Sequence, residues 1–138
     1  MTPAVRCVLE TSLYVEDLER SARFYQQLFG FERLLDEERL CALNVEGGQV
    51  LLLFKKGASR RPGNTPEGSV PSHDGAGELH LAFGVALEDV DLWKQKLYEN
   101  GIAIESLVHW QSGGTSIYFR DPDNHSVELA SPGTWTIY

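Results

Sequence analysis

The feature that most constrains the fold of this chain is a succession of hydrophobic patterns that occurs twice. Residues 5–54 predict a strand, a helix and three short strands, and residues 78–130 predict the same elements in the same order. Each half is therefore interpreted as a βαβββ module. Two such modules fit within the 138 residues of one ordinary domain. We expect a single α+β domain over residues 1–138.

The first module begins with strand-like alternation and continues with helical spacing. Residues 5–15 alternate towards their end, with Leu13 and Val15 on one face. Asp17 then offers a helix N-cap and Gly30 a C-terminal stop, around a helix of about three turns. Short apolar segments between turn-forming residues predict the remaining strands, at 31–35, 41–45 and 50–54.

The second module repeats this order with different residues. A strand predicted over 78–85 precedes a helical pattern over 88–100, which ends at Gly101. The remaining strands are predicted at 102–107, 116–119 and 126–130. Sequence identity between the two modules is low, so the repeat is inferred from the order of the elements.

The modules are separated by residues 55–77, which are rich in turn-forming residues. Glycine and proline make up 8 of these 23 residues, against 19 of 138 in the whole chain. Basic side chains give the segment a local positive charge: Lys55, Lys56, Arg60 and Arg61. A segment of this length is either a solvated connector or a functional flap.

The charge balance excludes several classes of function. With 12 basic and 20 acidic residues the net charge is −8, and such a surface repels phosphate backbones and anionic lipids. No apolar run approaches the roughly 20 residues that cross a bilayer, and the first residues lack the pattern of a secretory leader. We therefore expect a cytoplasmic protein without nucleic-acid or membrane partners.

Strand alternation directs three ionisable side chains to the face of the sheet opposite the helices: Glu10, His80 and Glu128. The first strands of the modules superpose with an offset of 70 (80 − 10) and the last strands with an offset of 76 (128 − 52). An imidazole with two carboxylates suits a divalent cation such as Zn, Mn, Fe, Co or Ni, with positions left open for substrate oxygens. The alternative is a hydrogen-bonded core histidine with two solvent-facing glutamates.

Three separated segments carry a resemblance to a known family: ETSLYVEDLERSARFYQQLFGFE, GELHLAFGV and GGTSIYFRDPDNHSVELASPG. In this order they resemble the vicinal oxygen chelate superfamily, which includes glyoxalases, bleomycin-resistance proteins and extradiol dioxygenases. The resemblance implies that the two modules form a cupped mixed sheet and bind a divalent metal ion. It also implies a homodimer in which each site draws on both chains.

The resemblance assigns metal-binding and catalytic roles to individual residues. The metal ligands fall on Glu10, His80 and Glu128, while a fourth ligand used by glyoxalase I falls on Leu52, which cannot ligate. A glutamate ligand can also remove a proton next to a carbonyl, so Glu10 and Glu128 are the candidate catalytic residues.

Three further residues are candidates for substrate binding. The segment SIYFRDPDNHSVEL is similar to the fosfomycin-resistance branch, whose substrate-contacting tyrosine and first-strand hydroxyl map to Tyr118 and Ser12. Trp110, together with residues 55–77, is expected to cover the site and exclude water. Because no arginine follows Arg120, the phosphonate-binding residue of that branch is missing, and we do not expect fosfomycin to be the substrate.

The resemblance thus favours a metal-dependent lyase, isomerase or thiol transferase acting on a substrate chelated through vicinal oxygens. One alternative is a metal-free protein of the bleomycin-resistance type, which would sequester an aromatic or cationic ligand. A further alternative is an extradiol-type dioxygenase.

Overall fold

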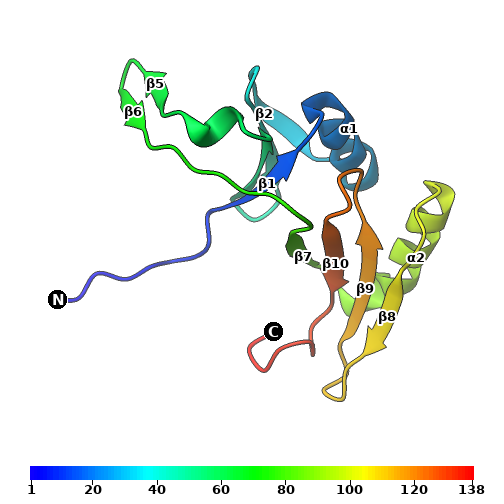
Figure 1. The fold of residues 1–138 in the computed structure, drawn as a ribbon. Helices are drawn as coiled ribbons and strands as arrows, with labels where there is room; N and C mark the ends of the chain where they lie inside the picture. Colours follow the sequence, from blue (N-terminus) through cyan, green and yellow to red (C-terminus); the bar gives the residue numbers. More distant parts are fainter. The chain divides into compact units, whose positions relative to one another are not determined.

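A computed structural model describes all 138 residues, and its internal contacts divide the chain into two units, unit 1 (1–76) and unit 2 (77–138). Each unit contains a helix packed on a four-stranded sheet (Figure 1). Neither of the two α-helices is long and apolar enough to cross a membrane.

Unit 1 has the predicted order of one strand, one helix and three strands. Its elements are β1 (Glu10–Val15), α1 (Leu18–Phe29), β2 (Glu32–Asp36), β3 (Leu40–Val45) and β4 (Gln49–Lys55). The strands lie in the order β1-β4-β3-β2, with β1 parallel to β4 and the other neighbours antiparallel. The helix begins where the Asp17 carboxylate accepts a hydrogen bond from the Arg20 amide at 3.0 Å. It ends at Gly30, whose φ of 75° is a conformation that residues with a Cβ rarely adopt.

The first strand begins later than the alternation predicts. Residues 1–9 are exposed and extend away from the sheet of unit 1, so the predicted start at residue 5 is wrong (Figure 1). The parallel partner strand explains this, because β4 begins at Gln49 and its next residue, Val50, already pairs with Glu10. Residues 5–8 therefore have no strand to pair with, whatever their own hydrophobic pattern.

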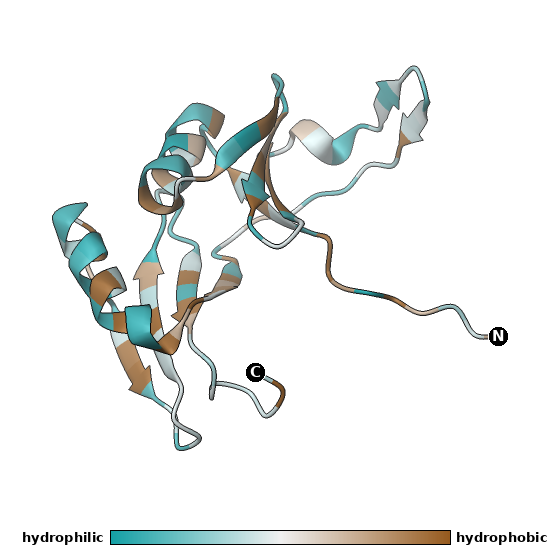
Figure 2. Ribbon diagram, turned by 180° about the vertical axis from the view of Figure 1, so that it is seen from behind, coloured by the Kyte–Doolittle hydropathy of each residue, from teal (hydrophilic) through white to brown (hydrophobic).

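The core of unit 1 lies between α1 and one face of the sheet. The buried face of the helix is formed by Ala22, Tyr25 and Leu28. The strands contribute apolar residues that are at most 1% exposed: Leu13, Val15, Leu43, Leu51 and Leu53. These positions follow the alternation expected of half-buried strands. Much of the outer surface of the helices is hydrophilic, while brown apolar segments run along the strands (Figure 2).

Unit 2 repeats this architecture. Its elements are β7 (His80–Gly84), the short 3₁₀ turn η2 (Leu87–Asp89), α2 (Val90–Glu99), β8 (Ser106–His109), β9 (Thr115–Arg120) and β10 (Ser126–Ala130). The strand order is β7-β10-β9-β8, with β7 parallel to β10. The strand predicted from residue 102 begins only at Ser106, because the Ile102 amide still donates to the Leu97 carbonyl at the end of the helix, at 2.9 Å.

The strand registers confirm the internal repeat. In unit 1 Glu10 pairs with Val50, and in unit 2 His80 pairs with Ser126. These pairs are separated by 70 residues on the first strand (80 − 10) and by 76 on the last (126 − 50), as the sequence offsets predict. The chain therefore has the predicted α+β fold of two βαβββ modules. The expectation that both modules form one domain over 1–138 stays a prediction.

The segment between the modules has structure of its own. It contains a 3₁₀ turn, η1 (Ala58–Arg60), and a small hairpin of β5 (Gly63–Thr65) and β6 (Gly68–Val70) that extends from the sheet of unit 1 (Figure 1). The residues that follow β6 are hydrogen-bonded to β1, because His73 Nδ1 lies 2.7 Å from the Tyr14 hydroxyl. A Cβ on Gly75 would lie 2.2 Å from the Tyr14 ring, so the backbone passes directly against that ring. Residues 56–76 thus form a folded arm of unit 1, which we call the arm.

Candidate functional site

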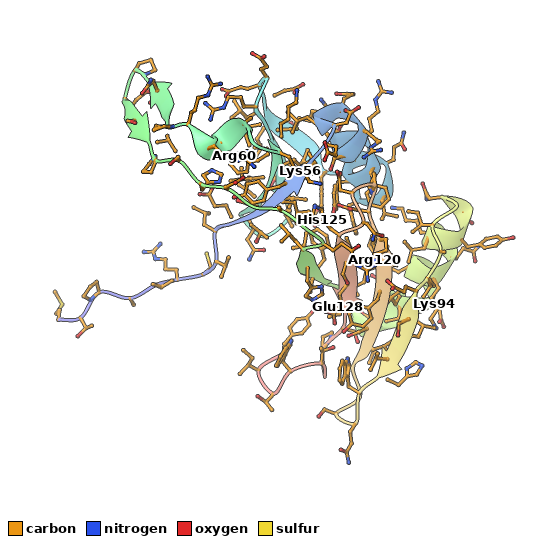
Figure 3. All side chains as sticks on the ribbon, viewed as in Figure 1. Lys56, Arg60, Lys94, Arg120, His125 and Glu128 are labelled. Atoms are coloured by element: carbon orange, nitrogen blue, oxygen red, sulfur yellow. The ribbon has the colours of Figure 1, made fainter.

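His80 and Glu128 meet on neighbouring strands of unit 2. The Glu128 side chain projects from β10 (Figure 3). His80 stands on β7, and its Nε2 lies 3.3 Å from Glu128 Oε2. The parallel register places Ala82 directly opposite Glu128 and His80 diagonally from it, on the same face of the sheet. The His80 side chain is 54% exposed and that of Glu128 only 9%, so the pair has one open side and one buried side.

The hydrogen bonds of His80 determine which ring nitrogen is available as a ligand. His80 Nδ1 lies 3.0 Å from the Ser126 carbonyl oxygen, which can only accept. Nδ1 therefore carries a proton, and in the neutral ring Nε2 presents its lone pair to the Glu128 carboxylate. Two acceptors that face each other need a proton or a cation between them. A backbone carbonyl that orients the far nitrogen is also the usual arrangement behind a metal-binding histidine.

The other oxygen of Glu128 is held by a chain of hydrogen bonds from β9. Ser116 Oγ donates to Glu128 Oε1 at 2.6 Å and accepts from Trp110 Nε1 at 2.8 Å. Since the hydroxyl has a single proton, the indole donation directs that proton to the carboxylate. Ser116 is fully buried and Glu128 is 7% exposed, so the carboxylate is fixed in a poorly hydrated place.

Tyr118 lies beside Glu128, opposite it in the β9–β10 register. Burial raises the pKa of the Tyr118 hydroxyl above its usual value, and the negative charge of Glu128 raises it further. The phenol therefore stays protonated at neutral pH and can donate a hydrogen bond. Its ring is stacked beside that of His80, with centroids 6.3 Å apart.

The remaining predicted site residues, Glu10 and Ser12, belong to unit 1. Glu10 is the exposed first residue of β1, and the half-buried Ser12 lies opposite Leu52. Neither unit by itself brings three His, Cys, Asp or Glu side chains together in a group that could hold a metal ion. Glu10 as the third ligand and Ser12 as a substrate contact stay predictions.

Two other histidines of unit 2 have structural partners. His125 is fully buried, and its Nδ1 accepts from the Leu79 amide at 2.9 Å. His109 Nδ1 lies 3.2 Å from Thr115 Oγ1. Both histidines therefore have a structural role: His125 holds the chain before β7, and His109 links β8 to β9.

Sequence reasoning missed Ser116, although a signal for it existed. Ser116 stands two residues before Tyr118 on one strand, so strand alternation places both on the face of Glu128. Trp110 was predicted as a cover for the site, and its indole N–H is occupied by Ser116. The indole can therefore provide an apolar wall but no free hydrogen-bond donor.

Unit 1 contains a cleft between its sheet and the arm. Its volume is about 580 Å³, which is within the range of small-molecule pockets. Apolar side chains dominate one part of the lining: Leu35, Leu40, Phe54, Val70 and Pro71. Arg39 and Arg61 add guanidinium groups, and Arg39 Nη2 donates to the Arg61 carbonyl at 2.9 Å.

The sequence matches the family model described as the glyoxalase/bleomycin resistance protein/dioxygenase superfamily over residues 7–129. The metallothiol transferase FosB of Bacillus licheniformis is 28% identical over 116 residues, which are 83% of this chain and 68% of that protein. The catechol-2,3-dioxygenase of Bacillus subtilis is 32% identical over 120 residues, which are 85% of this chain and only 38% of that protein.

A solved structure is similar over almost the whole chain. The lactoylglutathione lyase from Agrobacterium tumefaciens superposes with a TM-score of 0.88 and 32% sequence identity, covering 97% of this chain and 99% of that one. A metallothiol transferase, a dioxygenase and a lyase thus share similar sequence identity with this chain, 28–32%, although the chain spans only 38% of the dioxygenase. The reaction has to be argued from its own residues.

Proposed function

Because the chain belongs to the glyoxalase/bleomycin resistance protein/dioxygenase superfamily, we propose that it is a divalent-metal-dependent enzyme acting on a small substrate with two vicinal oxygens. The reaction we favour is a lyase, isomerase or thiol-transfer reaction. The observation that carries this proposal is the His80–Glu128 pair, in which an imidazole lone pair and a carboxylate oxygen face each other at 3.3 Å.

The donor set fits the metal that the family implies. Imidazole nitrogen and carboxylate oxygen are ligands for Zn, Mn, Fe, Co and Ni alike, so the ligand types do not select among them. His80 and Glu128 would hold the ion from unit 2, and Glu10 is the third ligand that we propose from unit 1. When bound, the ion would act as a Lewis acid that stabilises negative charge on a substrate oxygen.

The surroundings of each carboxylate suggest different tasks. Glu128 is buried and bonded to Ser116, so it is suited to be a fixed ligand. The backbone of Glu10 is paired in β1, but its exposed side chain makes no hydrogen bond or ion pair, so the carboxylate can reorient and accept a proton. We therefore assign proton abstraction to Glu10.

Tyr118 and Ser12 would bind substrate oxygens. Because the Tyr118 pKa is raised, this residue donates its proton in a hydrogen bond and does not act as a base near neutral pH. Trp110 would exclude water on the side of Ser116, to which its N–H is bonded.

The proposed metal site is tested by calorimetric titration of the metal-free protein with Mn²⁺, Fe²⁺, Co²⁺, Ni²⁺ and Zn²⁺ separately. We expect one ion per chain in the wild type and at least tenfold weaker binding in His80→Ala and in Glu10→Ala. Glu88→Ala is the matched control, because Glu88 is an exposed glutamate of η2, away from the paired strands. A wild type that binds none of the five ions would contradict the proposal.

The cleft of unit 1 favours a second candidate function, a metal-free binding protein. Its size and its partly aromatic lining suit a drug-sized ligand. Ligand binding that survives in both His80→Ala and Glu128→Ala, together with absence of metal binding, would favour this alternative. A homodimer is a further prediction, which sedimentation velocity tests directly.

A further inference from the structure

The segment after β10 folds back onto the sheet of unit 2. Its last aromatic residue, Tyr138, directs its hydroxyl to two backbone carbonyls, that of Ala130 at 3.2 Å and that of Val85 at 3.4 Å. The loop that carries it is closed by the Gly133 amide, which donates to the Tyr138 carbonyl at 2.6 Å. The backbone of residues 131–138 turns back beyond the end of β10 (Figure 1). The hydrogen bonds of Tyr138 therefore place its ring at the end of β7 and β10.

A close approach at Gly84 shows on which face of the sheet this ring lies. A Cβ on Gly84 would meet the Tyr138 hydroxyl oxygen at 2.6 Å. Side chains alternate along β7, so that Cβ would point to the same face as His80 and Ala82. The phenol therefore lies on the face that carries the His80–Glu128 pair.

The register gives the separation along the strands. Glu128 pairs with Ala82, and Ala130 pairs with Gly84, which is two residues further along β7. At roughly 3.3 Å per residue, the Tyr138 hydroxyl lies about 7 Å along the strands from the Glu128 position. The residues of β7 and β10 between them carry a methyl group or no side chain, so along these two strands the phenol is the group that limits the space. Trp110 lies on the other side, towards β9, where it bonds to Ser116 opposite Ala130.

We propose that Tyr138 forms one wall of the substrate site and limits the size of substrate groups that lie along β7 and β10. This inference rests on the proposed function, because it takes His80 and Glu128 as the centre of that site. Tyr138 is 43% exposed, and its two hydrogen bonds are long. Its replacement should therefore change selectivity and leave the fold intact.

The experiment measures binding of two vicinal-oxygen probes to the cobalt-loaded full chain under argon. Catechol is the small probe, and 3,6-dimethylcatechol carries a methyl group beside each oxygen. Binding is followed through the visible absorption bands of the cobalt ion, which needs no turnover. In the wild type we expect catechol to bind more tightly than its dimethyl derivative.

The preference for catechol is the ratio of the dissociation constants of 3,6-dimethylcatechol and catechol. In Tyr138→Ala this ratio should fall by about tenfold, because the wall is removed. Tyr138→Phe should retain the wild-type preference, since it keeps the ring and loses only the hydroxyl. Trp135→Ala is the matched control, an aromatic residue of the same loop that is 71% exposed.

The outcomes separate the two proposals. An unchanged preference in Tyr138→Ala, with normal cobalt bands, would overturn the role of Tyr138 and leave the metal site standing. A wild type without cobalt bands would overturn the metal site itself, and the substrate wall with it.

Discussion

Replacing Ser116 by alanine should lower both the stability of the fold and the affinity for metal, because Ser116 holds the Glu128 carboxylate in place. The substitution removes one hydroxyl and two hydrogen bonds, the 2.6 Å bond to Glu128 and the 2.8 Å bond from the Trp110 indole. The first bond is short and has a charged acceptor, and the Glu128 carboxylate would lose this partner in a place with little water.

The magnitude follows from the burial of these partners. A hydrogen bond to a charged group contributes about 1.5–3 kcal/mol, and a neutral one about 1 kcal/mol. Trp110 is 39% exposed, so water can replace most of the second bond. We therefore expect Ser116→Ala to lower the free energy of unfolding by about 2–3 kcal/mol and metal affinity by about 10- to 100-fold.

Urea unfolding of the metal-free protein measures the first quantity, and cobalt titration measures the second. Ser106→Ala on β8 is the matched control, because Ser106 is exposed and lies opposite Tyr118 in the register. A loss below about 0.5 kcal/mol together with unchanged metal affinity would refute the idea that Ser116 holds the carboxylate.

Three further predictions concern a titration and the arm. The Tyr118 phenol should ionise above its usual pKa, and in Glu128→Gln its midpoint should fall, as followed by absorbance at high pH against Tyr118→Phe. Since the folded-state pKa is raised, this group stabilises the fold below the unfolded-state pKa and loses that contribution as pH rises through the folded-state pKa. Tyr14→Phe removes the bond that fastens the arm, worth about 1 kcal/mol, so trypsin should cleave after Arg60 about fivefold faster. Gly75→Ala should destabilise the protein by about 1–3 kcal/mol in urea unfolding, because its Cβ would lie 2.2 Å from the Tyr14 ring; no change would refute this packing.

The parts of the fold that sequence reasoning predicted are those governed by local pattern. Alternation and capping located α1 between Asp17 and Gly30. The sequence offsets between the two modules, 70 for the first strands and 76 for the last, matched the register of the parallel pairs β1–β4 and β7–β10. The start of β1 was mispredicted because the length of a strand depends on its partner, here β4. Such a limit is not visible in the strand's own residues.

The site divides in the same way. Alternation predicted that His80 and Glu128 share one face of the sheet, and their 3.3 Å contact confirms this, while their role as metal ligands stays a prediction. The support from Ser116 and the approach of Tyr138 to Gly84 depend on contacts between segments distant in sequence. The arm shows the same limit, because its content of glycine and proline is typical of a connector, while its attachment to Tyr14 is a tertiary contact.

The proposed function requires that the His80 ring present Nε2 to a metal ion beside Glu128. The most direct measurement is a nitrogen-15 NMR spectrum of the four histidine side chains before and after addition of Zn²⁺, with His80→Gln to assign the ring. We expect His80 to carry its proton on Nδ1 and its Nε2 resonance to be the one that shifts on addition of metal. A His80 ring protonated on Nε2, or a spectrum unchanged by Zn²⁺, would contradict it.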